Sequence, residues 1–281
     1  MYFNSHTKIG LGTWRMGESA ITQSSEIQAI EHAVSIGYRL IDTAEMYANG
    51  QAESLIGKAL KNLGPSIRPS LTLVSKVLPT NASSQGMIKA CEASLRRLGC
   101  EYLDLYLLHW KSSYTFEQTI EGFLKLKDKG LIKHHGVSNF DVSDLKKWSD
   151  TEKSMGLSPS ESLATNQVYY SLGARGIEFD LAPHLAREKI SLMAYSPIDG
   201  GELMRHKELA VLASSLNITP AQLALAWSVR HPNTVAIPKS VSKFRIEENW
   251  ASKDLSLSPQ TLATLDRLFP PPRAKTSLAV I

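Results

Sequence analysis

Seven polar residues, of types that can act on a substrate or hold a ligand, recur along the chain at intervals of 28 to 44 residues. Most of them end a short apolar run, as in YRLID, LTLVSK and TVAIPK. A strand with its crossover helix needs about 30 residues, so one polar residue falls at the same point of each repeating β/α unit. The seven are Asp42, Lys76, His109, Asn139, Gln167, Tyr195 and Lys239.

Three of these residues, together with Tyr47, indicate acid–base chemistry. Asp42, Lys76 and His109 end predicted neighbouring strands, and Tyr47 follows Asp42 in its loop. Adjacent strands lie about 4.8 Å apart, so the four side chains can meet. We expect the Lys76 ammonium to lower the pKa of Tyr47 from its ordinary value of about 10, with Asp42 holding that ammonium in place.

A phenol tuned in this way can donate a proton to a developing alkoxide near neutral pH. We expect His109 to be neutral and to donate a hydrogen bond to the same carbonyl oxygen. The set of residues forms neither a nucleophile triad nor a metal-ligand group. The chemistry therefore needs an electron source, which points to a bound hydride donor.

The elements that position these residues alternate regularly between strand and helix. Strands are predicted at residues 8–12, 38–42, 71–76, 102–109, 132–137, 164–168, 191–196 and 234–237. One helix is predicted to be capped by Ser24 or Ser25 and another to start at Asp141 with Asp144. Further helices are predicted at residues 51–60, 87–98, 116–129, 181–188, 208–216, 220–230, 245–251 and 259–268. Eight such units favour a closed (α/β)8 TIM barrel, in which the carboxyl ends of the strands converge on one face.

Length and composition limit the remaining possibilities. Barrels of roughly 200–250 residues fold as one domain, so we expect residues 1–281 to form a single domain. The net charge of +4 is too small and scattered for a nucleic-acid partner, although it fits a local basic pocket for an anionic ligand. Gly10-Leu-Gly12 does not start a Rossmann motif, because the third glycine would fall at Arg15.

The cellular setting follows from cysteine use and hydropathy. Cys91 and Cys100 lack the spacing of a metal site, so we expect two free thiols in a reducing compartment. The N-terminal stretch MYFNSHTKIGLGTW has no apolar signal core, and no run approaches the roughly 18 apolar residues of a membrane helix. We expect a cytoplasmic monomer without a membrane partner or a metal.

Several candidate residues also have a plainer interpretation. His109 could be a hydrogen-bonded core histidine, and Asn139 could make an Asx-turn before Asp141. Trp14 and Trp110 could be ordinary packing aromatics. Their joint placement at predicted strand ends, where barrel enzymes do their chemistry, favours the functional interpretation.

Motifs across nearly the whole chain, in the same order and spacing, resemble those of the aldo-keto reductases. They are GTW (12–14), IDTAEMYANGQAE (41–53), LVSK (73–76), LDLYLLHW (103–110), GVSNF (136–140), NQV (166–168), AYSP (194–197) and IPKS (237–240). Within that family the segments ACEASLRRL, LYLLHW and ARGIEFDLAP are most similar to the bacterial methylglyoxal reductase type.

The resemblance implies an (α/β)8 barrel that binds NADPH in extended form without a Rossmann motif. It implies that Tyr47 is the general acid, that Asp42 and Lys76 tune it, and that His109 orients the substrate. Trp14 and Trp110, with Tyr47 and His109, would line the substrate site.

The resemblance also implies the cofactor contacts. The residues around the nicotinamide and its ribose would be Thr13, Asp42, Ser138, Asn139, Gln167 and Tyr195, with the Tyr195 ring stacked on the nicotinamide. The residues along the rest of the cofactor would be Ser196, Pro197, Ile198, Lys239, Ser240, Arg245, Glu248 and Asn249. Lys239, Ser240 and Arg245 would bind the 2′-phosphate, a role that a cation beside a helix N-terminus suits; a solvated helix face is the plainer alternative for Lys239 and Arg245.

The expected activity is NADPH-dependent reduction of aldehydes, α-oxoaldehydes such as methylglyoxal, and some ketones. One alternative is an NADPH-binding regulatory subunit, which would bind the cofactor tightly, turn over slowly and form a stable partner complex. The other is a phosphate-binding barrel enzyme with different chemistry, which would leave Tyr47 without a task.

Overall fold

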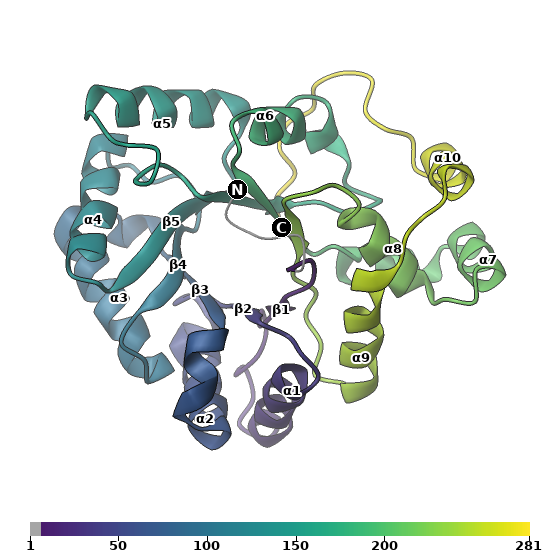
Figure 1. Ribbon diagram of the computed structural model, residues 1–281, viewed down its shortest axis with the longest axis horizontal. Coiled ribbons are helices and arrows are strands. Elements are labelled where there is room, and N and C mark those ends of the chain that lie inside the picture. Colours follow the sequence, from purple (N-terminus) through teal and green to yellow (C-terminus); the bar gives the residue numbers. More distant parts are fainter. Residues whose placement is uncertain (1–6) are drawn as a thin grey trace.

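The predicted strands form a ring of eight parallel strands in the computed structural model, which describes residues 7–281 (Figure 1). Each strand pairs with the next along the chain. The ring is closed by bridges from Ile9 to Ala236 and from Gly12 to Lys239. The strands are β1 (Leu11–Gly12), β2 (Leu40–Asp42), β3 (Thr72–Val77), β4 (Leu103–Leu108), β5 (Ile132–Ser138), β6 (Thr165–Tyr169), β7 (Ser191–Tyr195) and β8 (Thr234–Ala236). The predicted (α/β)8 TIM barrel is confirmed; residues 1–6 of the N-terminal stretch discussed above lie outside the described residues.

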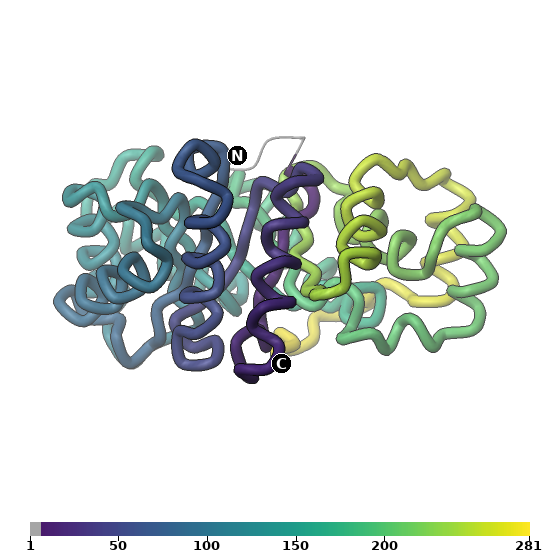
Figure 2. Tube along the Cα trace, turned by 90° about the horizontal axis from the view of Figure 1, so that it is seen from below, coloured from purple at the N-terminus to yellow at the C-terminus, as the bar shows by residue number. Residues whose placement is uncertain are grey.

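Helices surround the strands on the outside of the ring, and neighbours such as α1 and α2 stand side by side in the view of Figure 2. Within residues 7–281 no single helix is long and apolar enough to cross a membrane, whereas α7 and α8, bent by 87° at their junction, pass that test of length and composition as a pair. The helices are α1 (Gln23–Ser35), α2 (Gln51–Leu63), α3 (Ser84–Leu98), α4 (Phe116–Asp128), α5 (Val142–Ser154), α6 (Leu181–Arg187), α7 (Lys207–Ser215), α8 (Pro220–Ser228), α9 (Lys243–Ala251) and α10 (Pro259–Leu268).

Helix starts follow their capping residues. The predicted start at Asp141 is confirmed, because Asp141 and Asp144 form a reciprocal capping box at the start of α5. The prediction that Ser24 or Ser25 caps the first helix is wrong, because α1 begins at Gln23 after Thr22. The Ser25 hydroxyl lies inside the first turn and donates to the Thr22 carbonyl instead.

The alternation of side chains along the strands divides the core into two parts. A small cluster inside the barrel contains Leu105 and Leu107, whereas Tyr106 and Leu108 of the same strand face the helices. Gly12 allows the ring to close tightly, since a Cβ atom there would lie 2.6 Å from the Ile237 carbonyl oxygen. Apolar residues therefore fill the inside of the barrel, and the polar residues at the carboxyl ends of the strands remain free to form a site.

Candidate active site

The carboxyl ends of β2 and β3 join three of the predicted residues in one hydrogen-bonded group. Lys76 is fully buried on β3, and its ammonium donates to Asp42 Oδ2 at 2.7 Å, to the Thr43 carbonyl at 2.8 Å and to Tyr47 Oη at 3.0 Å. Tyr47 begins a short 3-10 turn, Tyr47–Gly50, shortly after β2 ends. All three donors of the ammonium are therefore used, and one of them is directed at the phenol.

The expected lowering of the Tyr47 pKa is wrong for this structure. Burial raises the pKa of Tyr47 above 10.0; the Lys76 ammonium opposes this shift, but the Asp42 carboxylate behind it adds to it. Burial alone would lower the pKa of Lys76, yet Asp42 and Tyr47 outweigh burial and raise it. At neutral pH the group is thus an ammonium beside a protonated phenol, which is the form that can donate a proton.

His109 follows β4 and faces Tyr47 across the same end of the barrel. The centres of the two rings are 5.8 Å apart at an angle of 71°. Burial and the nearby Lys76 lower the pKa of His109 to about 3, so the imidazole is neutral at pH 7, as predicted. Its buried Nδ1 has no hydrogen-bond partner among residues 7–281.

A polar network extends from this group across the barrel mouth. Gln167 on β6 donates through Nε2 to Asp42 Oδ1 at 2.7 Å, although 125 residues separate the two. The Thr13 hydroxyl donates to the Asp42 carbonyl at 2.9 Å, and the Ser138 hydroxyl donates to the Gln167 carbonyl at 2.9 Å. Four strands, β2, β3, β5 and β6, and the residue that follows β1 therefore contribute to one connected set of polar groups.

Asn139 and Tyr195 complete this side of the mouth. Asn139 has a left-handed backbone with φ of 60°. Its side-chain nitrogen Nδ2 donates to the His109 carbonyl at 3.3 Å. Tyr195, at the end of β7, donates through its hydroxyl to Asn139 Oδ1 at 2.9 Å. Asn139 thus connects two distant residues across the site and does more than make a local turn.

The residues predicted to line the remainder of an extended ligand form a second group, beside the first. Lys239 and Arg245 are exposed, and neither has a carboxylate partner in the part of the chain that the structure describes. Lys239 lies next to the first group, because its backbone forms a bridge with Gly12, the residue before Thr13. The other members of the second group follow β7 or β8 or lie on α9: Ser196, with φ of 47°, buried Pro197 and Ser240, half-buried Ile198 and Glu248, and buried Asn249.

Trp14 and Trp110 lie beside the polar network as half-exposed rings. Trp110 contacts His109, with ring centres 4.9 Å apart, and Trp14 packs against the Arg15 guanidinium at 4.7 Å. The side chain of Trp14 is 42% exposed and that of Trp110 is 40% exposed. Both rings therefore present apolar surface to solvent, one next to Thr13 in the chain and one next to His109.

Sequence reasoning missed three residues that support the predicted ones, Tyr169 by direct contact and Glu53 and Asp199 through a neighbouring residue. Glu53 is fully buried and accepts from the hydroxyl of Ser75, the residue before Lys76, at 2.6 Å. Tyr169 stacks on Tyr195, and Asp199 accepts a hydrogen bond from Tyr169. Tyr169 could have been found, because it lies two residues after Gln167 and a strand places such residues on one face.

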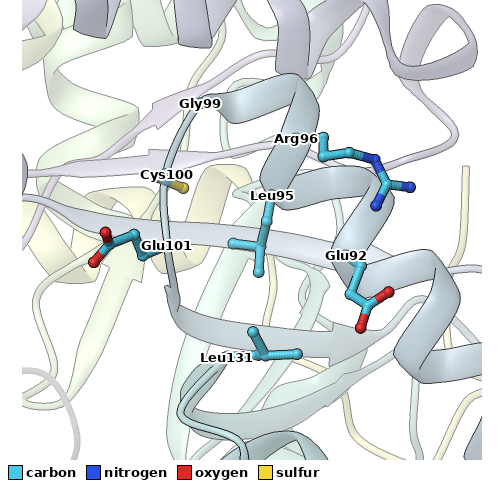
Figure 3. A pocket seen from close by; sticks show the side chains of 7 residues that line it. All are labelled: Glu92, Leu95, Arg96, Gly99, Cys100, Glu101 and Leu131. Atoms are coloured by element: carbon cyan, nitrogen blue, oxygen red, sulfur yellow. The ribbon is translucent and has the colours of Figure 1, made fainter.

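At the opposite end of the barrel a separate charged cluster is already ion-paired: Asp104 accepts from Arg68 and from Lys133, each at 2.8 Å. An open surface hollow there is lined by residues at the end of α3 and before β4 and β5, among them Glu92, Leu95, Cys100 and Leu131 (Figure 3). No group of three or more His, Cys, Asp or Glu side chains that could hold a metal ion occurs within residues 7–281. The network around Lys76 is therefore the candidate active site.

Comparison with known proteins agrees with this geometry. The family model described as "Aldo/keto reductase family" matches residues 8–269. Methylglyoxal reductase YeaE of Escherichia coli strain K12 is 43% identical over 279 residues, which cover 97% of this chain and 94% of that protein. Methylglyoxal reductase DkgB of Escherichia coli O157:H7 is 29% identical, with 92% of each chain covered. The crystal structure of an aldo/keto reductase from Klebsiella pneumoniae in complex with NADP and acetate has a TM-score of 0.90 at 43% identity and covers 97% of this chain and 95% of that one. The chain therefore belongs to the aldo/keto reductase family.

Proposed function

We propose that the protein is an NADPH-dependent reductase of aldehydes, α-oxoaldehydes of the methylglyoxal kind and some ketones. The observation that carries this proposal is the Lys76 ammonium, which donates to Tyr47 and Asp42 beside a neutral His109. Two relatives named methylglyoxal reductase support the substrate class. The Klebsiella pneumoniae structure with NADP supports the cofactor.

The residues at the edge of the site fit NADPH. Lys239 and Arg245 are exposed cations, the first shortly before α9 and the second in its first turn, which contains no acidic residue. Two exposed cations near a helix N-terminus suit a dianionic 2′-phosphate. At the other end of the site, Ser138, Asn139 and Gln167 bring hydroxyl and amide groups that can pair with a carboxamide. Bound NADPH would supply the hydride for the carbonyl carbon.

The protein's own residues would handle the carbonyl oxygen. Tyr47 donates its proton as negative charge develops on that oxygen, and Lys76 stabilises the phenolate that remains. Asp42 keeps Lys76 charged and fixed at 2.7 Å. Neutral His109 donates a hydrogen bond that orients the carbonyl, while Trp14 and Trp110 exclude water from one side. The protein would work as a monomer in the cytoplasm, where the free thiols of Cys91 and Cys100 fit a reducing environment.

A single assay tests the proposal. The loss of NADPH absorbance is followed with a panel of carbonyl compounds that includes methylglyoxal and an aromatic aldehyde. We expect aldehydes and α-oxoaldehydes to oxidise NADPH in a protein-dependent way and ketones to react more slowly. Tight NADPH binding without turnover of any carbonyl would instead support the regulatory-subunit alternative.

A further inference from the structure

The ring of Tyr195 is supported from behind by a second tyrosine. Tyr169 on β6 pairs in register with Tyr195 on β7. The two rings are nearly parallel, with an angle of 13° and centres 5.7 Å apart. Offset-stacked aromatic pairs with ring centres about 4.5–7 Å apart attract each other beyond the area that they bury. One face of the Tyr195 ring is therefore occupied by protein.

Tyr169 is itself held by the loop that follows β7. Its hydroxyl donates to Asp199 Oδ1 at 2.7 Å, and the Ser171 hydroxyl donates to the same oxygen. Asp199 has a left-handed backbone, with φ of 50°. The loop after β6 closes over its carboxylate so tightly that a Cβ atom on Gly173 would lie 2.3 Å from Asp199 Oδ2. Two loops thus fix the outer ring of the stack.

The far end of Tyr195 is fixed as well. Its hydroxyl donates to Asn139 Oδ1, and the Asn139 amide donates to the carbonyl of His109. A continuous series of contacts therefore runs from Asp199 through both tyrosines to the backbone of the candidate catalytic histidine. Only the face of Tyr195 turned away from Tyr169 can receive a further planar group.

We propose that Tyr169 is a positioning residue for the nicotinamide, acting through Tyr195, and that Asp199 holds Tyr169 in place. This inference rests on the proposed function, in which the nicotinamide stacks on Tyr195. Without the Tyr169 ring, Tyr195 can tilt backwards, so the nicotinamide loses its firm support. Both cofactor affinity and alignment with the carbonyl then suffer, although neither Tyr169 nor Asp199 touches the reacting atoms.

The test compares Tyr169→Leu, Tyr169→Phe and Asp199→Ala with the wild-type protein. NADPH affinity is measured by quenching of intrinsic fluorescence, and the kinetic isotope effect is measured with NADPH deuterated at C4. Tyr169→Leu should weaken NADPH binding about 3- to 10-fold, the scale of one aromatic pair, and should raise the isotope effect as hydride transfer becomes slower. Tyr169→Phe keeps the ring but loses the hydrogen bond to Asp199, so it should weaken binding about as much as Asp199→Ala does and less than Tyr169→Leu does.

The matched control is Tyr102→Leu, which removes a tyrosine at the other end of the barrel, where its ring packs between Arg68 and Lys133. This variant should lose stability without a change in affinity or isotope effect. Wild-type affinity and isotope effect in folded Tyr169→Leu would overturn the inference, as would equal damage from Tyr169→Phe. If Tyr169→Leu does not fold, Asp199→Ala decides: weakening of about twofold or more, from loss of the hydrogen bond that holds Tyr169, supports the role, and unchanged binding contradicts it.

The binding measurement separates this inference from the proposed function. A wild-type protein that binds NADPH but reduces no carbonyl would defeat the proposed function. The affinities of the Tyr169 variants would still show whether Tyr169 positions the cofactor.

Discussion

The buried pair of Asp42 and Lys76 provides a quantitative prediction about stability. Both side chains are almost wholly excluded from solvent, and their charged atoms lie 2.7 Å apart. Asp42→Asn leaves the Lys76 ammonium without its counter-charge, and Lys76→Met leaves the Asp42 carboxylate without its own. Removal of one partner from a buried pair destabilises a protein by about 3–5 kcal/mol, because an uncompensated charge remains inside.

The double variant removes both charges together. It still loses the bond from Lys76 to the Thr43 carbonyl at 2.8 Å, but no unpaired charge remains in the barrel. Residues in direct contact show coupling energies of about 0.5–3 kcal/mol, and the burial of this pair places it at the upper end of that range. We therefore expect the double variant to be roughly 2–3 kcal/mol more stable than the sum of the single effects predicts.

The assay is urea unfolding of the four proteins, followed by far-ultraviolet circular dichroism and by tryptophan fluorescence. Agreement of the two probes shows whether each transition is two-state, which the comparison of free energies of unfolding requires. Gln222→Ala on α8, away from the site, is the matched control and should add independently to either single change. Strict additivity of Asp42→Asn and Lys76→Met would refute the idea that their charges depend on each other.

Two further predictions concern the cofactor and pH. Lys239→Met should weaken NADPH binding by roughly 1.5–3 kcal/mol, the scale of a hydrogen bond to a charged group, and leave NADH almost unchanged; equal losses for both cofactors in a titration would exclude a 2′-phosphate role. Burial lowers the pKa of His109 to about 3, whereas an unfolded histidine titrates near pH 6.5, so the unfolded chain takes up this proton first. Stability from neutral His109 is thus complete above about pH 6.5 and is lost as pH falls toward 3. His109→Gln should lose less stability than wild type over that interval in urea unfolding, and parallel pH profiles would count against the assignment.

Much of the fold could be predicted from the sequence because its signal is local. Each strand is marked by a short apolar run that ends in a polar residue, all within a few consecutive positions. The regular recurrence of these runs indicated β/α units that close into a barrel. The same pattern placed Lys76 next to Asp42, since consecutive strands in such a barrel are neighbours. The start of α1 was predicted wrongly because three hydroxyl residues, Thr22, Ser24 and Ser25, lie close together there and each could cap a helix. The helix begins after Thr22 and not after Ser24 or Ser25.

The features that escaped prediction depend on depth and on contacts between distant segments. The pKa direction of Tyr47 is a balance between burial and two opposite charges, and strand spacing does not give the depth of burial. The bond between Gln167 and Asp42 crosses the barrel mouth between residues 125 positions apart. Asp199 reaches Tyr169 from a loop, whose path no periodic pattern encodes.

The measurement that tests the central claim most directly is single-turnover reduction of methylglyoxal by Tyr47→Phe, with NADPH affinity measured on the same sample. The substitution removes only the hydroxyl that Lys76 contacts at 3.0 Å. We predict a rate at least ~100-fold below that of the wild type, the lower end of general-acid effects, with unchanged NADPH affinity. A rate near that of the wild type would contradict the assignment of Tyr47 as the proton donor.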